Sequence, residues 1–207
     1  MDLEKEKFSY DKTLERIRKD LDTALTFLDY EKASQLIKKG LKKSKLLKNK
    51  FYQYYFKAES LILKEDYKKA IKYFDKALKI NPYDAETYND KALCLADLKE
   101  LDKALECIEL GLKLAGEHKI LYHNKGWILM EKEMYEKAII YFKKALEFDT
   151  SHSVSWANLA ECLKIRGDFE EALESYKKAL KFVPKNYPHI RERIKKEISA
   201  LKKFSKK

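Results

Sequence analysis

Glycine and proline are scarce in this chain of 207 residues, which has only 5 of the first and 3 of the second. Tight turns need these residues for their special backbone angles, so a turn-rich β fold is disfavoured. Long apolar runs are also missing, because no wholly apolar stretch exceeds the five residues seen at 138–142, far too few for a membrane span. The sequence therefore predicts long helices and no passage through a membrane.

Disulfide bonds and secretion are not indicated either. The three cysteines, Cys94, Cys107 and Cys162, are an odd number and lie far apart in the chain. The first twelve residues mix acids with lysines and contain no apolar core of a signal peptide. We therefore expect a protein of the reducing cytoplasm, in which the thiols pack as small apolar side chains.

Apolar and charged residues are both abundant. Hydrophobic residues make up 45% of the chain, with 14 Tyr, 10 Phe and 2 Trp, which is too much apolar mass for a disordered protein. Lysine and arginine outnumber aspartate and glutamate by 45 to 34, giving a formal net charge of +11. The length suits one domain or one continuous array with a sizeable core.

A period of 34 residues organises the chain. Alanines that follow an aromatic or leucine by three positions recur without insertion at Ala70, Ala104, Ala138 and Ala172. Small residues recur seven positions later and twelve positions earlier, and leucines form a further series at Leu61, Leu95, Leu129 and Leu163. A fainter copy surrounds Ala33, which precedes Ala70 by 37 residues, so three extra residues are expected in the connection around 48–50. Such a period is typical of stacked repeats.

The repeated positions have a physical meaning. Small residues mark places where two antiparallel helices approach closely, and the bulky residues between them fill the remaining space. Each helix pair leaves an apolar face that only the next pair covers, so the array needs an end cap. Apolar residues at helical spacing after Pro188 predict such a C-terminal helix: Ile190, Ile194, Ile198 and Leu201.

This pattern resembles the tetratricopeptide repeat over residues 14–186. The last repeat follows the family pattern with Trp156, Ala160, Leu163, Phe169, Ala172, Tyr176, Ala179 and Pro184. The resemblance implies an all-α, right-handed α-solenoid of five helix-turn-helix repeats with a C-terminal capping helix. The expected division is an N-terminal extension at 1–13, repeats at 14–47, 51–84, 85–118, 119–152 and 153–186, and a capping helix with a basic tail at 187–207.

No spacing typical of catalysis or metal binding occurs. The glycines do not form a phosphate-binding loop, and neither His-Glu-x-x-His nor Cys-x-x-Cys is present. Cys107, His118 and His123 have a spacing that fits no known metal site. Carboxylates are too numerous for any two to be singled out as an acid and a base. We expect no enzyme activity, no cofactor and no metal.

The resemblance implies that the first helix of each repeat lines a concave groove. Carboxylates outnumber lysines six to one at the groove positions of repeats two to five: Glu59, Glu86, Asp90, Asp97, Glu131 and Glu161 against Lys164. Aromatic residues would form its floor and asparagines would donate hydrogen bonds. The predicted groove residues are Tyr52, Tyr55, Phe56, Glu59, Asn89, Asp90, Leu93, His123, Asn124, Trp127, Asn158 and Glu161.

The predicted function is a non-catalytic protein–protein interaction module that binds a basic or aromatic-rich peptide segment of a partner in this groove. A plainer interpretation has the aromatic residues packing on neighbouring helices and the acids facing solvent. The cations with which some family members grip a partner's C-terminal carboxylate are almost all missing, and no register of the repeats supplies the set. A second copy of the chain, the first thirteen residues or the basic tail remain alternative occupants, so self-association stays open.

The excess lysine supports an alternative function. Lys68, Lys72, Lys76 and Lys79 follow one outward helix face, and further lysines crowd residues 38–50 and the C-terminal tail. Such a face is able to contact the phosphates of nucleic acid. No aromatic interleaving or RNA-binding motif is seen beside these lysines, so a solvated surface is the simpler explanation. Nucleic acid is therefore the alternative partner, behind a protein or peptide.

Overall fold

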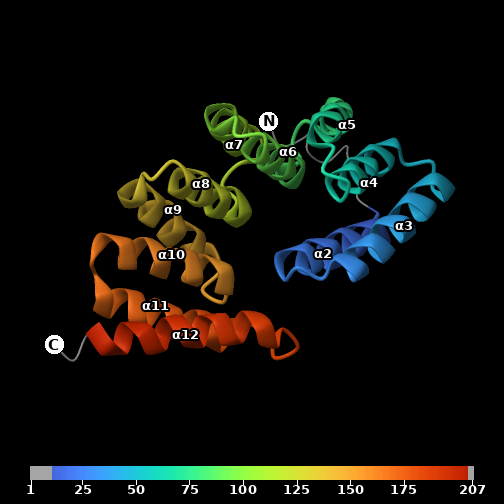
Figure 1. The fold of residues 1–207 in the computed structure, drawn as a ribbon. Coiled ribbons are helices and arrows are strands. Elements are labelled where there is room, and N and C mark those ends of the chain that lie inside the picture. The colour runs from blue at the N-terminus through green and yellow to red at the C-terminus, as the bar shows by residue number, and fades with distance from the viewer. Residues whose placement is uncertain (1–10, 205–207) are drawn as a thin grey trace. The chain divides into compact units, whose positions relative to one another are not determined.

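The computed structural model describes residues 11–204, which form eleven helices and no strand (Figure 1). The expected all-α fold is thereby confirmed. The chain divides into two compact units, unit 1 ending at Gly116 and unit 2 beginning at Glu117. Most of the expected N-terminal extension, at 1–10, and the end of the expected basic tail, at 205–207, lie outside the described residues.

Unit 1 contains three helix pairs, each joined by a short turn. Successive pairs are held together because α3 packs against α4 and α5 packs against α6. The core is apolar and includes aromatic side chains, with Phe51, Phe56 and Phe74 all buried. The helices are α2 (Lys12–Thr26), α3 (Tyr30–Leu46), α4 (Lys50–Ile62), α5 (Tyr67–Ile80), α6 (Ala85–Asp97) and α7 (Leu101–Ala115).

Unit 2 contains two helix pairs and a final helix: α8 (Lys119–Glu131), α9 (Tyr135–Phe148), α10 (Ser153–Arg166), α11 (Phe169–Phe182) and α12 (Pro188–Phe204). The last of these is the expected capping helix. It packs on α11 and buries Ile194 and Leu201. Arg191 ties it further to the end of α11, since its Nη1 donates hydrogen bonds to the carbonyl oxygens of Leu180 (2.9 Å) and Val183 (2.6 Å). No helix between residues 11 and 204 has the length and apolarity to cross a bilayer.

The repeated small residues lie where helices touch. Ala70, Ala104, Ala138 and Ala172 have no exposed surface. At Gly126, a Cβ atom would come within 2.9 Å of the Phe142 ring, closer than real Cβ contacts. The small size of these residues is therefore a packing requirement.

The turn inside each pair repeats as well. Leu28, Glu65, Lys99, Glu133 and Gly167 all have positive φ angles, and the last four are spaced by 34 residues. In each turn, the amide of the following residue donates to a carbonyl oxygen five residues back, as Glu100 N does to Leu95 O at 2.9 Å. This pairing is the Schellman motif, which ends a helix with a left-handed residue.

The sequence had suggested that the three extra residues of the first repeat lie in the connection, but they do not. α3 has 17 residues, whereas the equivalent helix α5 has 14. The insertion therefore lengthens α3 by almost one turn, and α4 begins only four residues after α3 ends. Asn49 closes the connection by accepting a hydrogen bond from the Tyr52 amide at the start of α4.

Candidate binding groove

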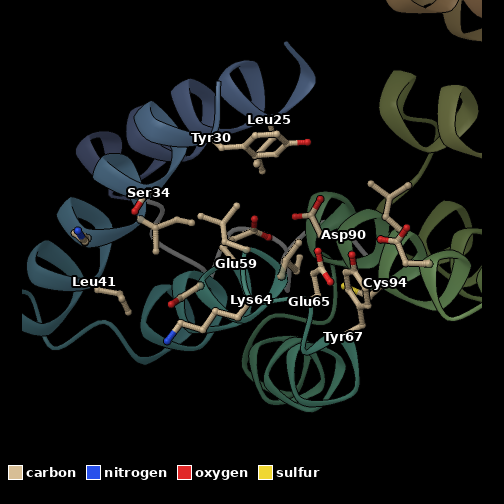
Figure 2. Close-up of a pocket in the computed structure, with 17 residues that line it drawn as sticks. Leu25, Tyr30, Ser34, Leu41, Glu59, Lys64, Glu65, Tyr67, Asp90 and Cys94 are labelled. Carbon is tan, nitrogen blue, oxygen red and sulfur yellow. The ribbon is translucent and has the colours of Figure 1, made fainter. Parts of the chain in front are cut away.

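A cavity of about 950 Å³ opens in unit 1 between the helices of its three pairs. First helices of the pairs contribute Glu59 on α4 and Asp90 on α6, as expected for a groove lined by such helices. The second helix α3 contributes Tyr30 and Ser34, which the sequence analysis did not anticipate (Figure 2). Both its volume and its mixed polar and apolar walls suit a ligand-binding site.

Arg18 on α2 dominates the polar interior of unit 1. Its side chain is only 2% exposed, and it reaches across α4 to the first residues of α6. Nη1 and Nη2 donate to the two carboxylate oxygens of Asp84 at 2.9 and 2.6 Å, and Nε lies 2.7 Å from a carboxylate oxygen of Glu86. The guanidinium carbon lies 4.1 Å from the centre of the Tyr55 ring, a cation–π contact. Arg18 therefore connects all three pairs of unit 1.

Electrostatic pairing also fixes the protonation state of Asp84. Burial by itself would raise the pKa of this carboxyl, but the adjacent Arg18 guanidinium and the Thr87 hydrogen bonds reverse the effect, so the pKa lies below its ordinary value. Asp84 caps α6 by accepting from the Thr87 amide at 2.9 Å. One carboxylate thus holds both a helix start and a buried arginine.

The three predicted aromatic anchors of unit 1 are buried side chains. Phe56 has no exposed surface, Tyr52 is 1% exposed and Tyr55 is 4% exposed. The Tyr52 hydroxyl donates to Glu15 on α2, and the Tyr55 hydroxyl donates to Asp90 on α6 at 2.9 Å. These residues therefore support the groove from beneath, as the plainer interpretation had it, and Phe56 offers a ligand no surface.

Glu59 and Asp90 bring two carboxyl groups to the cavity. Glu59 is 2% exposed, and its Oε1 atom has no hydrogen-bond partner among the described residues. Asp90 accepts from the Tyr55 hydroxyl and, at 3.1 Å, from the Asn89 side-chain amide. Figure 2 shows both residues at the wall of the same cavity, from α4 and α6.

Both carboxyl groups are hard to ionise. Burial raises the pKa of Glu59 well above its ordinary value, and the negative charge of Asp90 raises it further. Burial likewise raises the pKa of Asp90, to about 7, against the opposing influence of Arg18 and the Tyr55 hydrogen bond. Near neutral pH, the pair therefore retains a proton that ordinary carboxyl groups have lost.

His123, a predicted groove residue of unit 2, has neutral partners. His123 is buried and its Nδ1 lies 2.8 Å from Ser155 Oγ, which is also 2.6 Å from His152 Nδ1. Burial, aided by His152, lowers the pKa of His123 to about 3, so the ring is uncharged. Asn124 is buried as well, whereas Trp127 and Asn158 keep part of their surface exposed.

Glu161 is a predicted groove carboxylate of unit 2, and it has two partners. The Tyr176 hydroxyl donates to its Oε2 at 2.5 Å, and Lys164 Nζ lies 2.8 Å from the same atom. Burial works to raise its pKa, but these two contacts lower it below the ordinary value. The remaining predicted residue, Leu93, lies in unit 1 at the cavity wall.

Family models of the tetratricopeptide repeat match residues 61–124, 121–152 and 153–186, which together exceed half of the chain. The chain belongs to the tetratricopeptide repeat family. Repeats of this family form a scaffold for protein–protein interaction, generally without catalysis. No curated protein sequence matches the chain.

Solved structures with the same fold include several tetratricopeptide proteins. TTC0263, a thermophilic TPR protein in Thermus thermophilus, aligns with a TM-score of 0.70 and 19% identity over 88% of this chain and 98% of that one. YrrB, described as a TPR protein with an unusual peptide-binding site, gives 0.54 and 22% over 83% and 88%. MamA from Desulfovibrio magneticus gives 0.58 and 18% over 76% and 93%. At these identities the likeness concerns the fold, an all-α solenoid of helical repeats.

The cysteines of this tetratricopeptide protein are buried thiols. Burial raises the pKa of Cys107 to about 11 and that of Cys162 to about 12, and that of Cys94 rises higher still. Thiols with raised pKa values are poor nucleophiles. Among residues 11–204, no three metal-ligating side chains come together.

The lysine-rich faces contain aromatic rings, contrary to the sequence analysis. Lys76 Nζ lies 4.8 Å from the centre of the Tyr73 ring and 5.8 Å from that of Tyr54. Lys144 stands 68 residues later, two tetratricopeptide periods, and contacts Tyr122 and Tyr141 in the same way. Sequence inspection missed this interleaving because each lysine and one of its rings come from the two different helices of a pair.

Sequence reasoning also missed the role of Arg18. The 34-residue frame, with its three-residue insertion, places Arg18 at the position that Tyr55 and Asn89 hold in the next repeats. That alignment was a usable signal, because it puts the arginine beside the Tyr55 ring. Its pairing with Asp84 was not predictable, since Asp84 precedes α6 and belongs to none of the repeated groove positions.

Proposed function

We propose that this tetratricopeptide protein is a non-catalytic interaction module, and that its inner face binds a basic or aromatic-rich peptide segment of a partner. The observation that carries the proposal is the cavity of unit 1. Its wall contains four carboxyl groups, of Glu59, Glu65, Asp90 and Asp97, against the two lysines Lys38 and Lys64. In a chain with a net charge of +11, this local excess of acid favours a cationic ligand.

Apolar side chains in the same wall support a peptide rather than a small ion. Ile37, Leu41 and Leu63 line the cavity beside the acids, and Tyr30, at 58% exposure, stands at its edge. Burial of a peptide's apolar groups against such side chains supplies affinity, while the acids orient the approach of a basic segment. YrrB, a solved structure of the same fold, is described as having a peptide-binding site, which supports such a role for this chain.

Trp127 is the aromatic anchor that we propose for unit 2, because part of its side chain remains exposed. Truncation of a true anchor costs on the order of 2 kcal/mol or more in binding, or about 30-fold in affinity. Trp127→Ala is therefore expected to weaken the peptide by about that factor. Asp90→Lys is expected to slow association and to flatten its dependence on salt.

Selection from a random peptide library displayed on phage, followed by titration of the enriched peptides, tests the proposal. We expect the enriched sequences to carry lysine or arginine together with aromatic residues. Glu106→Lys, at an exposed position on α7, is the matched control for the charge change and is expected to bind like the parent. Enrichment of no peptide, or equal binding by the parent, Trp127→Ala and Asp90→Lys, would contradict the proposal.

A further inference from the structure

We propose that the cavity of unit 1 binds one arginine side chain of the partner segment, whose guanidinium lies between the carboxylates of Glu59 and Asp90. This inference rests on the proposed function, because it names the side chain that the inner face of unit 1 selects. It adds a specific binding site at Glu59 and Asp90, here called the arginine site, together with a specific ligand group and a coupling of binding to proton release.

Glu59 is the decisive residue. Its side chain is 98% buried, it lines the cavity, and its Oε1 atom has no hydrogen-bond partner among residues 11–204. A buried polar atom without a partner destabilises the folded state, and more so when it is charged. An acceptor that is left open in this way, at the wall of a cavity, is suited to a donor that arrives with a ligand (Figure 2).

Arg18 does not fill this role, although it is close enough to influence both carboxyl groups. Its two terminal nitrogens donate to Asp84, the N-cap of α6, and its Nε lies 2.7 Å from a carboxylate oxygen of Glu86 in the first turn without forming a hydrogen bond. The Tyr55 ring packs against its guanidinium, and the hydroxyl of that ring points to Asp90. The ion pairs of Arg18 are therefore with Glu15, Asp84 and Glu86, and not with Glu59 or Asp90.

Asp90 supplies the second carboxyl group and is held in place. The Tyr55 hydroxyl donates to Oδ2 and the Asn89 amide donates to Oδ1, so both oxygens are oriented by one hydrogen bond each. A carboxylate accepts about four hydrogen bonds in total, which leaves room for a ligand's donors. A guanidinium with five N–H groups is able to reach two carboxylates at once.

The choice of arginine over lysine follows from burial. Glu59 is almost completely removed from solvent, so a ligand cation must leave much of its water behind. A guanidinium is more weakly hydrated than an ammonium and loses less on such a transfer. The stem of an arginine would pass the apolar wall formed by Ile62, Leu63 and Leu93.

Protonation is coupled to this binding. The carboxyl groups of Glu59 and Asp90 retain a proton between them because burial raises the pKa of both, that of Asp90 to about 7. A cation that binds the ionised pair releases the proton, so affinity rises with pH by roughly up to tenfold per unit. The titratable and charged groups that face the pair are Asp22 and Arg18 on α2, Tyr30 and Lys38 on α3, Tyr55 on α4, Lys64 and Glu65 in the following turn, Tyr67 on α5, and Cys94 and Asp97 on α6.

The test uses the full chain and N-acetyl-arginine amide as the probe. Carbon-13 NMR of the side-chain carboxyl groups follows Glu59 and Asp90 directly during the titration. N-acetyl-citrulline amide is the matched neutral probe, since it has nearly the same shape without the charge, and N-acetyl-lysine amide with a free ε-amino group tests the choice of cation. We expect the arginine probe to shift both carboxyl signals and to bind at least about tenfold more tightly than either of the other two.

Matched variants locate the site. Glu59→Gln and Asp90→Asn keep the side-chain shape and are each expected to weaken the arginine probe by about tenfold or more. Glu106→Gln makes the same change at an exposed position on α7, outside the predicted groove residues, and is expected to bind like the parent. Circular dichroism checks that each variant is folded. Affinity for the parent should rise between pH 5 and pH 7, and this rise should be reduced in Glu59→Gln.

The outcomes separate this inference from the proposed function. Equal binding of the arginine and citrulline probes, or unchanged affinity in Glu59→Gln, overturns the proposal of an arginine site, even where library peptides bind elsewhere on the inner face. Conversely, if NMR confirms the arginine site, the inference holds even if the library selection enriches no peptide. If a second copy of the chain is the occupant, sedimentation shows a dimer that Glu59→Gln dissociates, and the proposal of a partner's arginine is wrong.

Discussion

Glu59 in unit 1 and Glu161 in unit 2 occupy the same position of the 34-residue repeat, yet their surroundings differ. Glu161 has a tyrosine hydroxyl and a lysine beside it, and its pKa is lowered. Glu59 has an unpartnered oxygen and a neighbouring carboxyl group, and its pKa is raised. The repeat position therefore fixes where a side chain lies, whereas residues outside that position decide which protonation state it adopts.

The two units also differ in the basic side chain that each one buries. Unit 1 buries a permanently charged Arg18 and neutralises it with the carboxylates of Asp84 and Glu86. Unit 2 buries His123 without charge, in hydrogen-bond contact with Ser155. Unit 1 thus has charged groups in its interior, and Glu59 there has a carboxyl oxygen without a partner among the residues that the structure describes. In unit 2 the buried His123 is uncharged, and Glu161 already has its partners. This difference is why the cation site is proposed for unit 1 alone.

Removing Arg18 should have the largest effect. Arg18→Met leaves Asp84 buried without its cation, and breaking a buried pair in this way costs about 3–5 kcal/mol. Urea unfolding followed by circular dichroism measures the loss. Arg16→Met changes an exposed arginine on the same helix and is expected to cost far less. Equal stability of the two variants would show that the ionic network does not hold unit 1 together.

Glu59 and Glu161 give a sharper test, because the same Glu→Gln substitution should change stability in opposite directions at the two positions. Glu59 has a raised pKa in the folded state, so its contribution is most favourable below the unfolded value of 4.5 and is lost as pH rises through the folded pKa. Glu59→Gln should therefore raise stability at pH 8 by about 1–3 kcal/mol and change little near pH 4.

Glu161→Gln is the counterpart. Its carboxyl has a lowered pKa, so its contribution is present above the unfolded value of 4.5 and is lost as pH falls through the folded pKa. The substitution should therefore lower stability at pH 8, with a smaller effect at low pH. Thermal melts of both variants at pH 4 and pH 8 make the comparison. Shifts of the same sign at pH 8 would contradict the contrast between the units.

His123 makes unit 2 sensitive to acid. Its folded pKa of about 3 lies below the unfolded value of 6.5, so the unfolded chain takes up a proton first as pH falls. Stability should decline from pH 6.5 toward pH 3, by about 2 kcal/mol between pH 6.5 and pH 5. Hydrogen exchange of α8 and α10 at several pH values, corrected for intrinsic rates, follows the change. His123→Asn, which imports the residue found at Asn89 in unit 1, should flatten it.

Most of the fold was predictable because its cause is periodic. Ala70, Ala138 and the residues spaced from them by 34 identify close helix contacts, and the same packing repeats wherever the residue types repeat. The C-terminal helix was predictable from the apolar spacing of Ile194, Ile198 and Leu201. Two structural features were not: the division into two units after Gly116, and the extension of α3 by the inserted residues.

The candidate site was predictable only in part. The frame placed Glu59 and Asp90 on the inner face, because both lie on first helices at groove positions. Their protonation states depend on Tyr55, Arg18 and the depth of burial, which are properties of three-dimensional packing. The contribution of α3 to the cavity wall also follows from packing, since Tyr30 and Ser34 belong to a second helix that the family pattern turns away from the groove.

The smallest expected effect concerns the turns that both units share. The turn of each pair ends the first helix with a left-handed residue, which is Lys99 in the last pair of unit 1 and Gly167 in the last pair of unit 2. A side chain at positive φ is strained by its Cβ atom, and glycine is free of this strain. Lys99→Gly should therefore stabilise unit 1 by about 0.5–1 kcal/mol, since the exposed lysine contributes little packing there.

Two variants control this prediction. Lys99→Ala removes the lysine side chain but keeps the Cβ atom, and it should give no gain. Gly167→Ala introduces the strain into unit 2 and should cost about 1 kcal/mol, although an added Cβ there meets no atom within 4 Å. Urea unfolding of the three variants measures the differences. If Lys99→Ala stabilises as much as Lys99→Gly, relief of backbone strain is not the cause, and the turns of the two units are equivalent despite their different residues.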